Sequence, residues 1–567
     1  MPSSPVSLQA TLRQRLDSAP DRRAIAFVDG KGDYEWISFG DFFQEAAAAG
    51  HALTENGIKP GDACIFVLSS DRACAATVLG SLLAGAVPTL CAPPVVRGLH
   101  SNLPEVVSHV AGRTKARLVV LGEESASLAL PLTESGFNLA QVGDLVANGD
   151  SDSVTLADPD ADSIVARQLT SGTTGLPKIC VWKQHRVLAS LDGMVAAMGL
   201  GEDDLFVNWT PLYHDMGLVN NFFLCLAKGI PLGWLQASDF VKKPVGWLRA
   251  LHDLGASTTW SPNFGYAMTA QRVTDEEMEG VRLDHVKGFW NAAERIHAES
   301  IDAFQARFER FGLSNHAVKT NFGCAENVGG ATFSSLTEPP AIETVDRRAL
   351  HDDGVAKVIS DDDAETETVR IVSTGAPYPG MTIRIVGDNG ESLPEGHVGE
   401  VALDTPSRMV GYLEEPEETA QAIRGEELFT GDVGYLRNNE LFWTGRVRER
   451  INLNGKKYDP SDFEGTLFEV DGLREGCFAA FGIDDGERGS QRLVIVTEVR
   501  DRTERTHDEI LRDIRRKIAT RMNVSVSEIL LLPQAAMSKT SSGKRRHRFY
   551  RELHLSDGLQ PVAAWQE

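Results

Sequence analysis

The sequence predicts an α/β protein of at least two domains, with mostly parallel sheets and a separate β-rich unit. At 567 residues the chain exceeds what a single hydrophobic core usually holds. Between about residues 24 and 330, short apolar runs alternate with amphipathic stretches, as in layered α/β folds. From about residue 368 to 443 the segments become short and strand-like, with Gly, Asn and Pro turns between them, which favours a small β-rich unit.

Four apolar runs in the first region predict buried strands, and two amphipathic stretches predict helices. The strands are expected at residues 63–68, 116–121, 163–169 and 317–322, and the helices at residues 38–57 and 298–312, the last ending at a Gly312 cap. In such a fold the functional groups lie on loops at the strand ends.

Residues 73–96 form an uncharged, apolar segment long enough to cross a membrane. Two glycines and three prolines interrupt it, so we expect a buried helix followed by a strand. The N-terminus lacks the apolar core of a signal peptide, and the seven cysteines are scattered without a CxxC pair. These features favour a cytoplasmic protein without a membrane span, a disulfide framework or a zinc site.

The formal net charge of −24 argues against a nucleic-acid-binding protein, because neutralising phosphates requires clustered Lys and Arg. The charge is unevenly distributed: residues 512–551 hold 11 basic residues and only two acidic ones. A solvated basic surface is the simplest interpretation of that segment.

The loop “QLTSGTTGLPKIC” at residues 168–180 lies between two apolar runs and contains hydroxyl groups, glycines and one lysine. Small residues leave backbone N–H groups free to surround an anion, and the lysine adds a positive charge. The spacing does not match the Walker A pattern GxxxxGK[ST]. The loop is therefore a candidate polyphosphate site, although a surface loop of this composition needs no ligand.

This loop strongly resembles the phosphate loop of the acyl-adenylate-forming (AMP-binding, ANL) superfamily, and six companion motifs follow in that family's order. They are “TPLYHDMGL” (210–218), “NAAERI” (291–296), “NFGCAE” (321–326), “LFTGDVGY” (428–435), “GRVRERINLNGKKYDPSDFE” (445–464) and “KTSSGK” (539–544). The resemblance covers roughly residues 20–550. It implies ATP-dependent activation of a carboxylic acid to acyl-AMP, with release of pyrophosphate.

The resemblance also implies how the domains are organised. We expect a large N-terminal domain at residues 1–446, with two layered α/β subdomains and a small β-barrel-like subdomain at about residues 368–443. A small, mobile α+β domain is expected at residues 447–567. Arg448 occupies its hinge position, where the family usually has Asp or Lys.

By resemblance, the nucleotide site combines residues from several of these motifs. ATP or AMP would be bound by Thr170, Ser171, Gly172, Thr173, Thr174, Gly175, Lys178, Ala293, Glu294, Asn321, Phe322, Gly323, Cys324, Ala325, Asp432 and Arg446. Phe322 is expected to stack on adenine, and Asp432 to bind both ribose hydroxyls. The family branch commonly reads Gly-Ala-Glu-Pro around Glu294, whereas this chain has Ala292 and Arg295 at the two ends, which can shift that loop.

Adenylation concentrates negative charge in the transition state, so cations and a metal ion carry much of the catalysis. The resemblance assigns Mg²⁺ to Thr170 and Glu326, whose oxygens suit a hard cation. It assigns a catalytic role to Lys544, which would reach the carboxylate and the α-phosphate from the C-terminal domain. His214 would position these groups rather than transfer a proton.

Several segments are similar to one branch of the superfamily, the fatty acyl-AMP ligases. These segments are residues 243–268, 344–357 and 538–553. The 48 residues between Glu326 and Gly375 resemble the insertion that is thought to restrain the C-terminal domain in this branch and to disfavour transfer to CoA. We therefore expect ATP and Mg²⁺ as cofactors and a separate acyl carrier protein as partner, in lipid, polyketide or nonribosomal peptide biosynthesis.

Two alternative activities stay open on the sequence. An acyl-CoA synthetase would form a CoA thioester from the same acyl-AMP. A ligase for an aryl or unusual short acid would need a narrow acyl pocket, which Phe222, Phe223 and Trp290 would provide unless they simply pack in the core.

The basic segment offers a docking surface for an acidic carrier protein, as an alternative to a merely solvated surface. Replacing Arg545, Arg546 and Arg548 together is then expected to slow acylation of the carrier and to leave adenylation intact.

Overall fold

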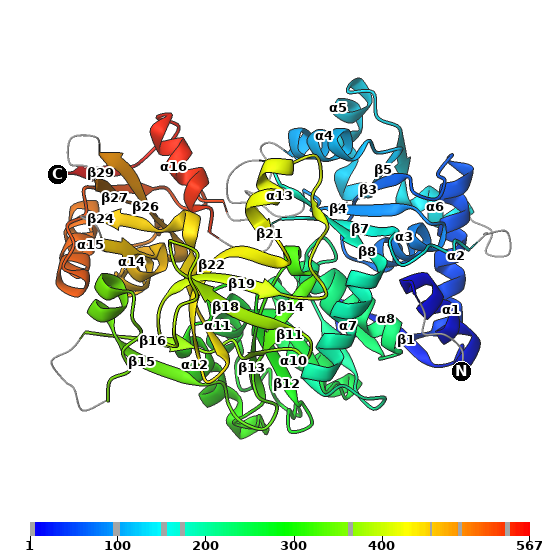
Figure 1. Ribbon diagram of the computed structural model, residues 1–567, viewed down its shortest axis with the longest axis horizontal. Helices are drawn as coiled ribbons and strands as arrows, with labels where there is room; N and C mark the ends of the chain where they lie inside the picture. The colour runs from blue at the N-terminus through cyan, green and yellow to red at the C-terminus, as the bar shows by residue number, and fades with distance from the viewer. Residues whose placement is uncertain are drawn as a thin grey trace.

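The computed structural model of the chain describes residues 6–94, 103–148, 156–170, 176–360, 367–453, 456–485, 490–538 and 545–567. The predicted site residues Ser171, Gly172, Thr173, Thr174, Gly175 and Lys544 lie outside these described residues. Figure 1 shows the N-terminal residues (blue) and the C-terminal residues (orange to red) at opposite ends of the molecule.

Two sheets with mostly parallel central strands form the larger part of the fold (Figure 1). Within the described residues, the first has the order β17-β14-β13-β12-β11-β9-β10-β1-β2: β1 (Arg23–Val28), β2 (Trp36–Ser38), β9 (Phe206–Asn208), β10 (Leu232–Leu235), β11 (Thr258–Pro262), β12 (Gly288–Ala292), β13 (Val318–Cys324), β14 (Gly329–Phe333) and β17 (Ala376–Pro377). The second has the order β20-β8-β7-β4-β3-β5-β6: β3 (Ala63–Val67), β4 (Val87–Cys91), β5 (Leu118–Leu121), β6 (Leu139–Gln141), β7 (Ile164–Leu169), β8 (Ile179–Lys183) and β20 (Gly411–Tyr412). The predicted α/β layering is confirmed.

Helices cover both sheets, and their positions agree with the apolar patterns. They are α1 (Leu8–Ser18), α2 (Phe39–Glu55), α3 (Arg72–Leu83), α4 (Leu103–Thr114), α5 (Ala129–Glu134), α6 (Val142–Asn148), α7 (Gln184–Met198), α8 (Leu224–Lys228), α9 (Ala237–Lys242), α10 (Val245–Leu254), α11 (Asn263–Arg272) and α12 (Ala298–Phe308). The apolar segment at residues 73–96 contains most of α3 and all of β4, as predicted. In the described residues, no helix combines the length and apolar character needed to cross a membrane.

Close packing of α2 on α3 depends on two glycines. A Cβ on Gly80 would lie 2.3 Å from the carbonyl oxygen of Ala46, and one on Gly50 would lie 2.7 Å from that of Gly80. Both distances are shorter than a van der Waals contact, so larger residues would push the two helices apart. Helix α3 packs on β3 and β4 of the second sheet and α2 packs on β1 and β2 of the first, so the pair connects the two sheets.

An antiparallel sheet forms most of the β-rich unit: β18 (Thr382–Val386), β19 (Gly399–Asp404), β21 (Ile423–Arg424), β22 (Glu427–Arg437) and β23 (Glu440–Arg446). The first expected strand of the unit lies elsewhere, because β16 (Thr368–Val372) pairs with β15 (Ile342–Asp346) in a two-stranded sheet of its own. Helix α13 (Pro416–Ala422) follows β20 and precedes β21. The β22–β23 hairpin places Asp432 directly opposite Arg446.

The C-terminal unit, by which we mean residues 451–567, is a compact α+β structure with its own core. It contains β24 (Ile451–Leu453), β25 (Lys456–Tyr458), α14 (Pro460–Leu467), β26 (Leu473–Asp485), β27 (Ser490–Val499), α15 (His507–Met522), β28 (Glu528–Leu532), α16 (His547–Leu555) and β29 (Ala563–Gln566). Helix α14 begins with a capping box. The side chain of Asp459, the N-cap residue, accepts a hydrogen bond from the backbone of the third helical residue, Asp462, and the side chain of Asp462 accepts one from the backbone N–H of Asp459. Two carboxylates therefore gather at the start of α14.

The bulky residues considered above for a narrow acyl pocket pack in the core instead. Phe222, Phe223 and Trp290 are 0%, 1% and 2% exposed and belong to the main hydrophobic cluster. They are not among the lining residues of the two cavities in which the predicted site residues lie. The core interpretation of these side chains is confirmed.

Candidate active site

The predicted site residues line two adjoining cavities at the carboxyl ends of the parallel strands. The larger, a cleft of about 2450 Å³, lies between the ends of β11, β12 and β13 on one side and the start of α14 on the other. The smaller, of about 510 Å³, lies toward β7, β8 and α13. Both are lined by Ala293, Asn321, Gly323 and Arg446, so a single ligand is able to extend from one into the other.

Residues 321–325 form one wall of this site. Asn321, Phe322 and Gly323 line the large cleft, and Cys324 and Ala325 line the smaller cavity. A Cβ on Gly323 would lie 2.5 Å from the carbonyl oxygen of Gly329, so the wall requires glycine there. The backbone is thereby kept close to whatever occupies the cleft.

The segment after β12, the strand next to β13, also lines the cleft and has contacts beyond those of a simple adenine contact. Ala293 has φ +70°, a left-handed conformation that usually favours glycine. Glu294 accepts a hydrogen bond of 2.6 Å from the backbone N–H of Phe264, in the first turn of α11. Both residues line the cleft, but Glu294 also supports the start of this helix, and Arg295 extends toward the C-terminal unit.

Asp432 is almost fully buried and is held in place by two donors. Trp443 Nε1 and Arg446 Nε donate to the same Oδ1 atom at 3.0 and 3.1 Å. The charge of Asp432 raises the pKa of Arg446 above its ordinary value, outweighing the opposite effect of burial. The result is a fixed carboxylate at the edge of the cleft, a suitable acceptor for hydroxyl groups.

His214 lies where the two cavities meet. Its Nδ1 is 2.8 Å from Asp215 Oδ1 and 3.2 Å from the backbone nitrogen of Met216. These contacts at the start of the π-helical segment Met216–Phe223 fix the ring orientation. The arrangement fits a positioning role between the two cavities.

Lys178 and Thr170 bring the two ends of the polar loop together. The N–H of Thr170 donates to the carbonyl of Lys178 at 2.9 Å. Strand β20 pairs with β8 and places the Tyr412 ring 4.7 Å from Lys178 Nζ, while Glu418 of α13 accepts a hydrogen bond from the same ammonium. All four residues line the smaller cavity, which is therefore the candidate phosphate site.

The oxygens proposed for Mg²⁺ lie in the same cavity. Glu326 Oε1 accepts a hydrogen bond of 2.7 Å from Tyr412 Oη, and Thr170 lies on the loop end described above. Burial and the Glu326 charge raise the pKa of Tyr412, so the phenol stays a donor. Mg²⁺ usually takes one or two protein carboxylates plus phosphate oxygens, so this donor set fits a phosphate-bound ion. Among the described residues, no group of three His, Cys, Asp or Glu side chains is arranged to hold a metal ion by itself.

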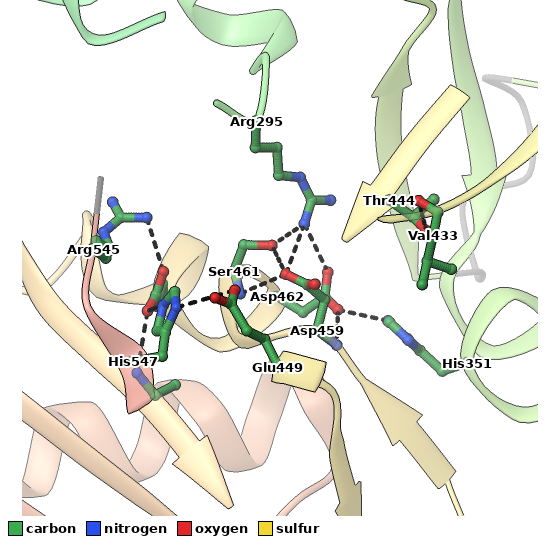
Figure 2. A network of polar contacts seen from close by, with 12 residues as sticks. Arg295, His351, Val433, Thr444, Glu449, Asp459, Ser461, Asp462, Arg545 and His547 are labelled. Carbon is green, nitrogen blue, oxygen red and sulfur yellow. Dashed lines mark hydrogen bonds and ion pairs between the residues drawn. The ribbon is translucent and has the colours of Figure 1, made fainter. Parts of the chain in front are cut away.

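Arg295 links the cleft wall after β12 to the C-terminal unit (Figure 2). Its Nη1 lies 3.5 Å from Asp462 and 3.7 Å from Asp459, and it donates a hydrogen bond to Ser461 Oγ. His351 approaches Asp462 from the other side at 3.6 Å. Burial and the neighbouring Asp462 raise the pKa of Asp459, and the Arg295 guanidinium opposes this rise, so Arg295 matters for keeping the two carboxylates ionised. Burial lowers the pKa of His351, so this ring contributes mainly through its position.

A second charged group fixes the start of α16 (Figure 2). His547 lies between Glu464 (Nε2–Oε1, 2.6 Å) and Glu449 (Nδ1–Oε2, 3.3 Å), and Arg545 pairs with Glu464 at 2.8 Å. Burial alone would lower the pKa of His547, but the two carboxylates outweigh it and raise the pKa to about 10. The residues that directly follow Lys544 are thus anchored to α14 and to the hinge segment.

The structure corrects one expectation about the basic segment. Arg545 is not a free docking cation, because it neutralises Glu464, a side chain only 1% exposed. Arg546 and Arg548 line the smaller cavity together with Lys178 and Glu326. Replacing the three arginines would therefore disturb the site itself and would not test docking alone.

The residues between Glu326 and Gly375 contact the C-terminal unit, as the similarity to the restraining insertion suggested. Asp352 pairs with Lys456 of β25 at 2.7 Å, and the His351 ring lies 5.0 Å from the ring of Tyr458. Together with the His351–Asp462 pair, these contacts would have to break for the C-terminal unit to rotate.

Sequence reasoning missed three residues at the site: Tyr412, Glu418 and Trp443. Trp443 had a usable signal, because Asn438 and Asn439 form a two-residue turn with positive φ that sets the register of the hairpin. That register brings Trp443 to the same strand end as Asp432. Tyr412 and Glu418 reach Lys178 only through the pairing of β20 with β8, which no local pattern indicates.

Comparison with known proteins gives a consistent result. Residues 12–413 match the family model described as AMP-binding enzyme. The long-chain-fatty-acid–AMP ligase FadD26 of Mycobacterium marinum is 27% identical, with 99% of each chain covered. The medium-chain-fatty-acid–[acyl-carrier-protein] ligase JamA of Moorena producens is 26% identical over 94% of this chain and 92% of its own.

A solved structure from work on fatty acyl-adenylate ligases from E. coli and L. pneumophila has the same fold. Its TM-score is 0.90 at 23% identity, with 98% of this chain and 99% of the other chain covered. The arrangement of both α/β sheets, the β-rich unit and the C-terminal unit is therefore shared along the full length.

Proposed function

The chain belongs to the AMP-binding enzyme family, and from this premise we propose that it is an ATP-dependent ligase for a fatty or related carboxylic acid. In the first step the acid and ATP form acyl-AMP and pyrophosphate. In the second step the thiol of a holo acyl carrier protein takes the acyl group, and AMP leaves. FadD26 and JamA align with nearly the whole chain. The name of FadD26, a fatty-acid–AMP ligase, supports the first step, and the name of JamA, a fatty-acid–[acyl-carrier-protein] ligase, supports the second.

One observation carries the proposal: of two joined cavities, one is lined by side chains suited to a nucleoside and the other by side chains suited to polyphosphate. Phe322 and Asp432 line the larger cleft and suit a base and a ribose. Lys178 and Glu326 line the smaller cavity and suit phosphates with a metal ion. His214 lies at the junction, where the α-phosphate of a bound ATP would be.

The reaction at this junction needs no nucleophile from the protein. An oxygen of the substrate carboxylate attacks the α-phosphorus, and the bond from the α-phosphorus to the oxygen bridging to the β-phosphorus breaks as pyrophosphate leaves. Lys178 holds the departing phosphates, and His214 orients the carboxylate. Mg²⁺, held by Thr170 and Glu326, would supply further positive charge to the phosphate oxygens. Lys544 is proposed to add a cation from the C-terminal unit.

The contacts of His351 and Asp352 with the C-terminal unit support a carrier protein rather than CoA as the acceptor. In the fatty acyl-AMP ligases, which this chain resembles, a restraint of this kind is thought to disfavour transfer to CoA, and the pairs of His351 and Asp352 supply such contacts. An acyl-CoA synthetase is the alternative, and it predicts rapid turnover with CoA alone.

The test is one reaction panel with purified protein, Mg²⁺–ATP and a series of carboxylic acids, in which acyl-AMP, acyl-CoA and acyl-carrier products are resolved. We expect acyl-AMP to accumulate in the presence of CoA and to disappear only when a holo-carrier is added. Rapid acyl-CoA formation would establish the alternative. Absence of acyl-AMP with every aliphatic acid, but not with aryl acids, would assign a different substrate class.

A further inference from the structure

Glu418 connects the candidate phosphate lysine to the hinge residue through one carboxylate oxygen. Lys178 donates a hydrogen bond to Glu418 Oε2, and Arg448 Nη2 lies 3.1 Å from that same atom. Arg448 also donates to Gln421 Oε1 at 2.9 Å, one turn further along α13. Lys178 and Arg448, which are 240 and 30 positions from Glu418 in the sequence, thus compete for the same carboxylate oxygen.

The pair with Lys178 is the stronger of the two interactions. The hydrogen bond from Lys178 is the main reason why the pKa of Glu418 lies below its ordinary value, and the contribution of Arg448 is smaller. Arg448 is half-exposed, whereas the side chains of Lys178 and Glu418 are 28% and 30% exposed. In this structure Glu418 therefore interacts mainly with Lys178, and its ion pair with Arg448 is the weaker of the two.

Polyphosphate bound in the smaller cavity would change which cation Glu418 pairs with. Phosphate oxygens would attract the Lys178 ammonium, and their negative charge would repel the Glu418 carboxylate, which lines the same cavity. Among the residues that the structure describes, Arg448 is the other cation paired with Glu418. As Lys178 turns toward phosphate, Glu418 can pair fully with Arg448.

We propose that Glu418 is a positioning residue that couples pyrophosphate occupancy of the smaller cavity to the hinge at Arg448. This inference rests on the proposed function. While the β- and γ-phosphates or pyrophosphate are bound, Lys178 holds them and the Glu418–Arg448 pair holds the hinge. When pyrophosphate leaves, Lys178 returns to Glu418 and the hinge is released for the second step.

The position of the C-terminal unit is consistent with this order of events. Arg546 and Arg548, at the start of α16, line the cavity in which Glu418 and Lys178 lie. In Figure 1, α13 lies between α16 and the sheet that contains β4, β7 and β8. Bound pyrophosphate would therefore attract cations of the C-terminal unit while it tightens the hinge, and both effects end when pyrophosphate leaves.

The test is hydrogen exchange over residues 447–453, measured with Mg²⁺–pyrophosphate, with a non-hydrolysable ATP analogue, and with AMP. For the natural chain we expect exchange to slow at least threefold with the first two ligands and to stay unchanged with AMP. In Glu418→Gln the response to pyrophosphate should disappear, while pyrophosphate binds as tightly or up to about fivefold more tightly by calorimetry, because a competitor for Lys178 has been removed.

Two variants serve as matched controls. Glu417→Gln makes the same change in charge at an exposed neighbour on α13, and Gln421→Ala removes the other α13 contact of Arg448; both should keep the response. Lys178→Met supplies an independent test, because it should slow hinge exchange without any ligand by leaving Glu418 to Arg448.

A pyrophosphate response retained in Glu418→Gln, or no response in the natural chain although calorimetry shows that pyrophosphate binds, would overturn the proposal. Fast hinge exchange in ligand-free Lys178→Met would also contradict it. Failure of the natural chain to bind either ATP or pyrophosphate is a different result, since it would reject the proposed function itself.

Discussion

Arg295 Nη1 lies 3.5 Å from Asp462 Oδ1 and joins the wall of the larger cleft to the first turn of α14. The Arg295 side chain is 16% exposed and that of Asp462 only 4%, so the pair is largely protected from solvent. The resemblance noted above places proline at position 295 in related chains. Here the cleft wall therefore has a charged link to the C-terminal unit that proline is unable to make.

Replacing Arg295 should loosen the C-terminal unit. In Arg295→Met, Asp459 and Asp462 lose a cation from a buried site, which costs roughly 3 kcal/mol, or on the order of a hundredfold in the docking equilibrium. We expect faster proteolysis near residues 447–453 and slower adenylation. Adding Asp462→Asn to Arg295→Met removes one of the two uncompensated charges, so the double variant should recover part of the resistance to proteolysis and part of the adenylation rate. Unchanged proteolysis in Arg295→Met would show that this link does not hold the unit.

Changing the buried carboxylate of the cleft should weaken ATP binding. Asp432→Asn keeps the size of the side chain but loses the charge that pairs with Arg446 and would accept the ribose hydroxyls. The KM for ATP is expected to rise tenfold or more, on the scale of roughly 1.5–3 kcal/mol for a hydrogen bond to a charged group.

The control for this prediction is Trp443→Phe, which removes one of the two donors to Asp432 and keeps the carboxylate. Its KM for ATP should rise only a few fold. Steady-state kinetics at saturating acid separates the two variants, and equal effects would argue against a direct role of the carboxylate.

Glu326 and Tyr412 allow a test of the metal assignment. The measurement is the rate of pyrophosphate exchange into ATP, titrated with Mg²⁺. In Glu326→Gln the Mg²⁺ concentration that gives the half-maximal rate should rise at least tenfold, because a neutral amide is a poor ligand for Mg²⁺. Tyr412→Phe removes only the hydrogen bond that orients the carboxylate, so a shift of a few fold is expected. If the two titrations moved together, Glu326 would act through orientation of Tyr412 and not as a ligand.

Much of the fold was predictable because local patterns determine it. The runs at residues 63–68 and 116–121 contain fully buried strands, since apolar residues without interruption suit strands covered on both faces. Residues 163–169 also form a strand, but it includes Arg167 and Gln168 and begins with the exposed Ile164. The helix at residues 298–312 ends near Gly312, which has φ +94° as a cap requires. Expected residues from several separate motifs also line one pair of cavities.

The links between these motifs were not predictable from local sequence. Arg295 meets Ser461 across 166 positions, and Lys178 meets Glu418 across 240. Such pairs depend on how whole sheets and the C-terminal unit pack, so composition and spacing do not reveal them. For the same reason Arg545, which reads as part of a solvated basic surface, is in fact the partner of a buried glutamate.

The pairing of His547 predicts a specific dependence of stability on pH. Its folded pKa of about 10 lies above the ordinary value of 6.5, because Glu464 and Glu449 favour the charged ring more than burial disfavours it. The ion pairs should therefore contribute fully to the stability of the folded chain below pH 6.5, and this contribution should be lost as the pH rises toward 10.

The urea midpoint of the C-terminal unit in His547→Gln is expected to be well below that of the natural chain at pH 6, and the difference between the two midpoints should narrow progressively up to pH 10. His316→Gln, at an exposed histidine of the N-terminal region, should leave this transition unchanged at every pH. A gap that stays constant or widens with pH would mean that His547 is neutral in the folded chain and contributes through packing alone.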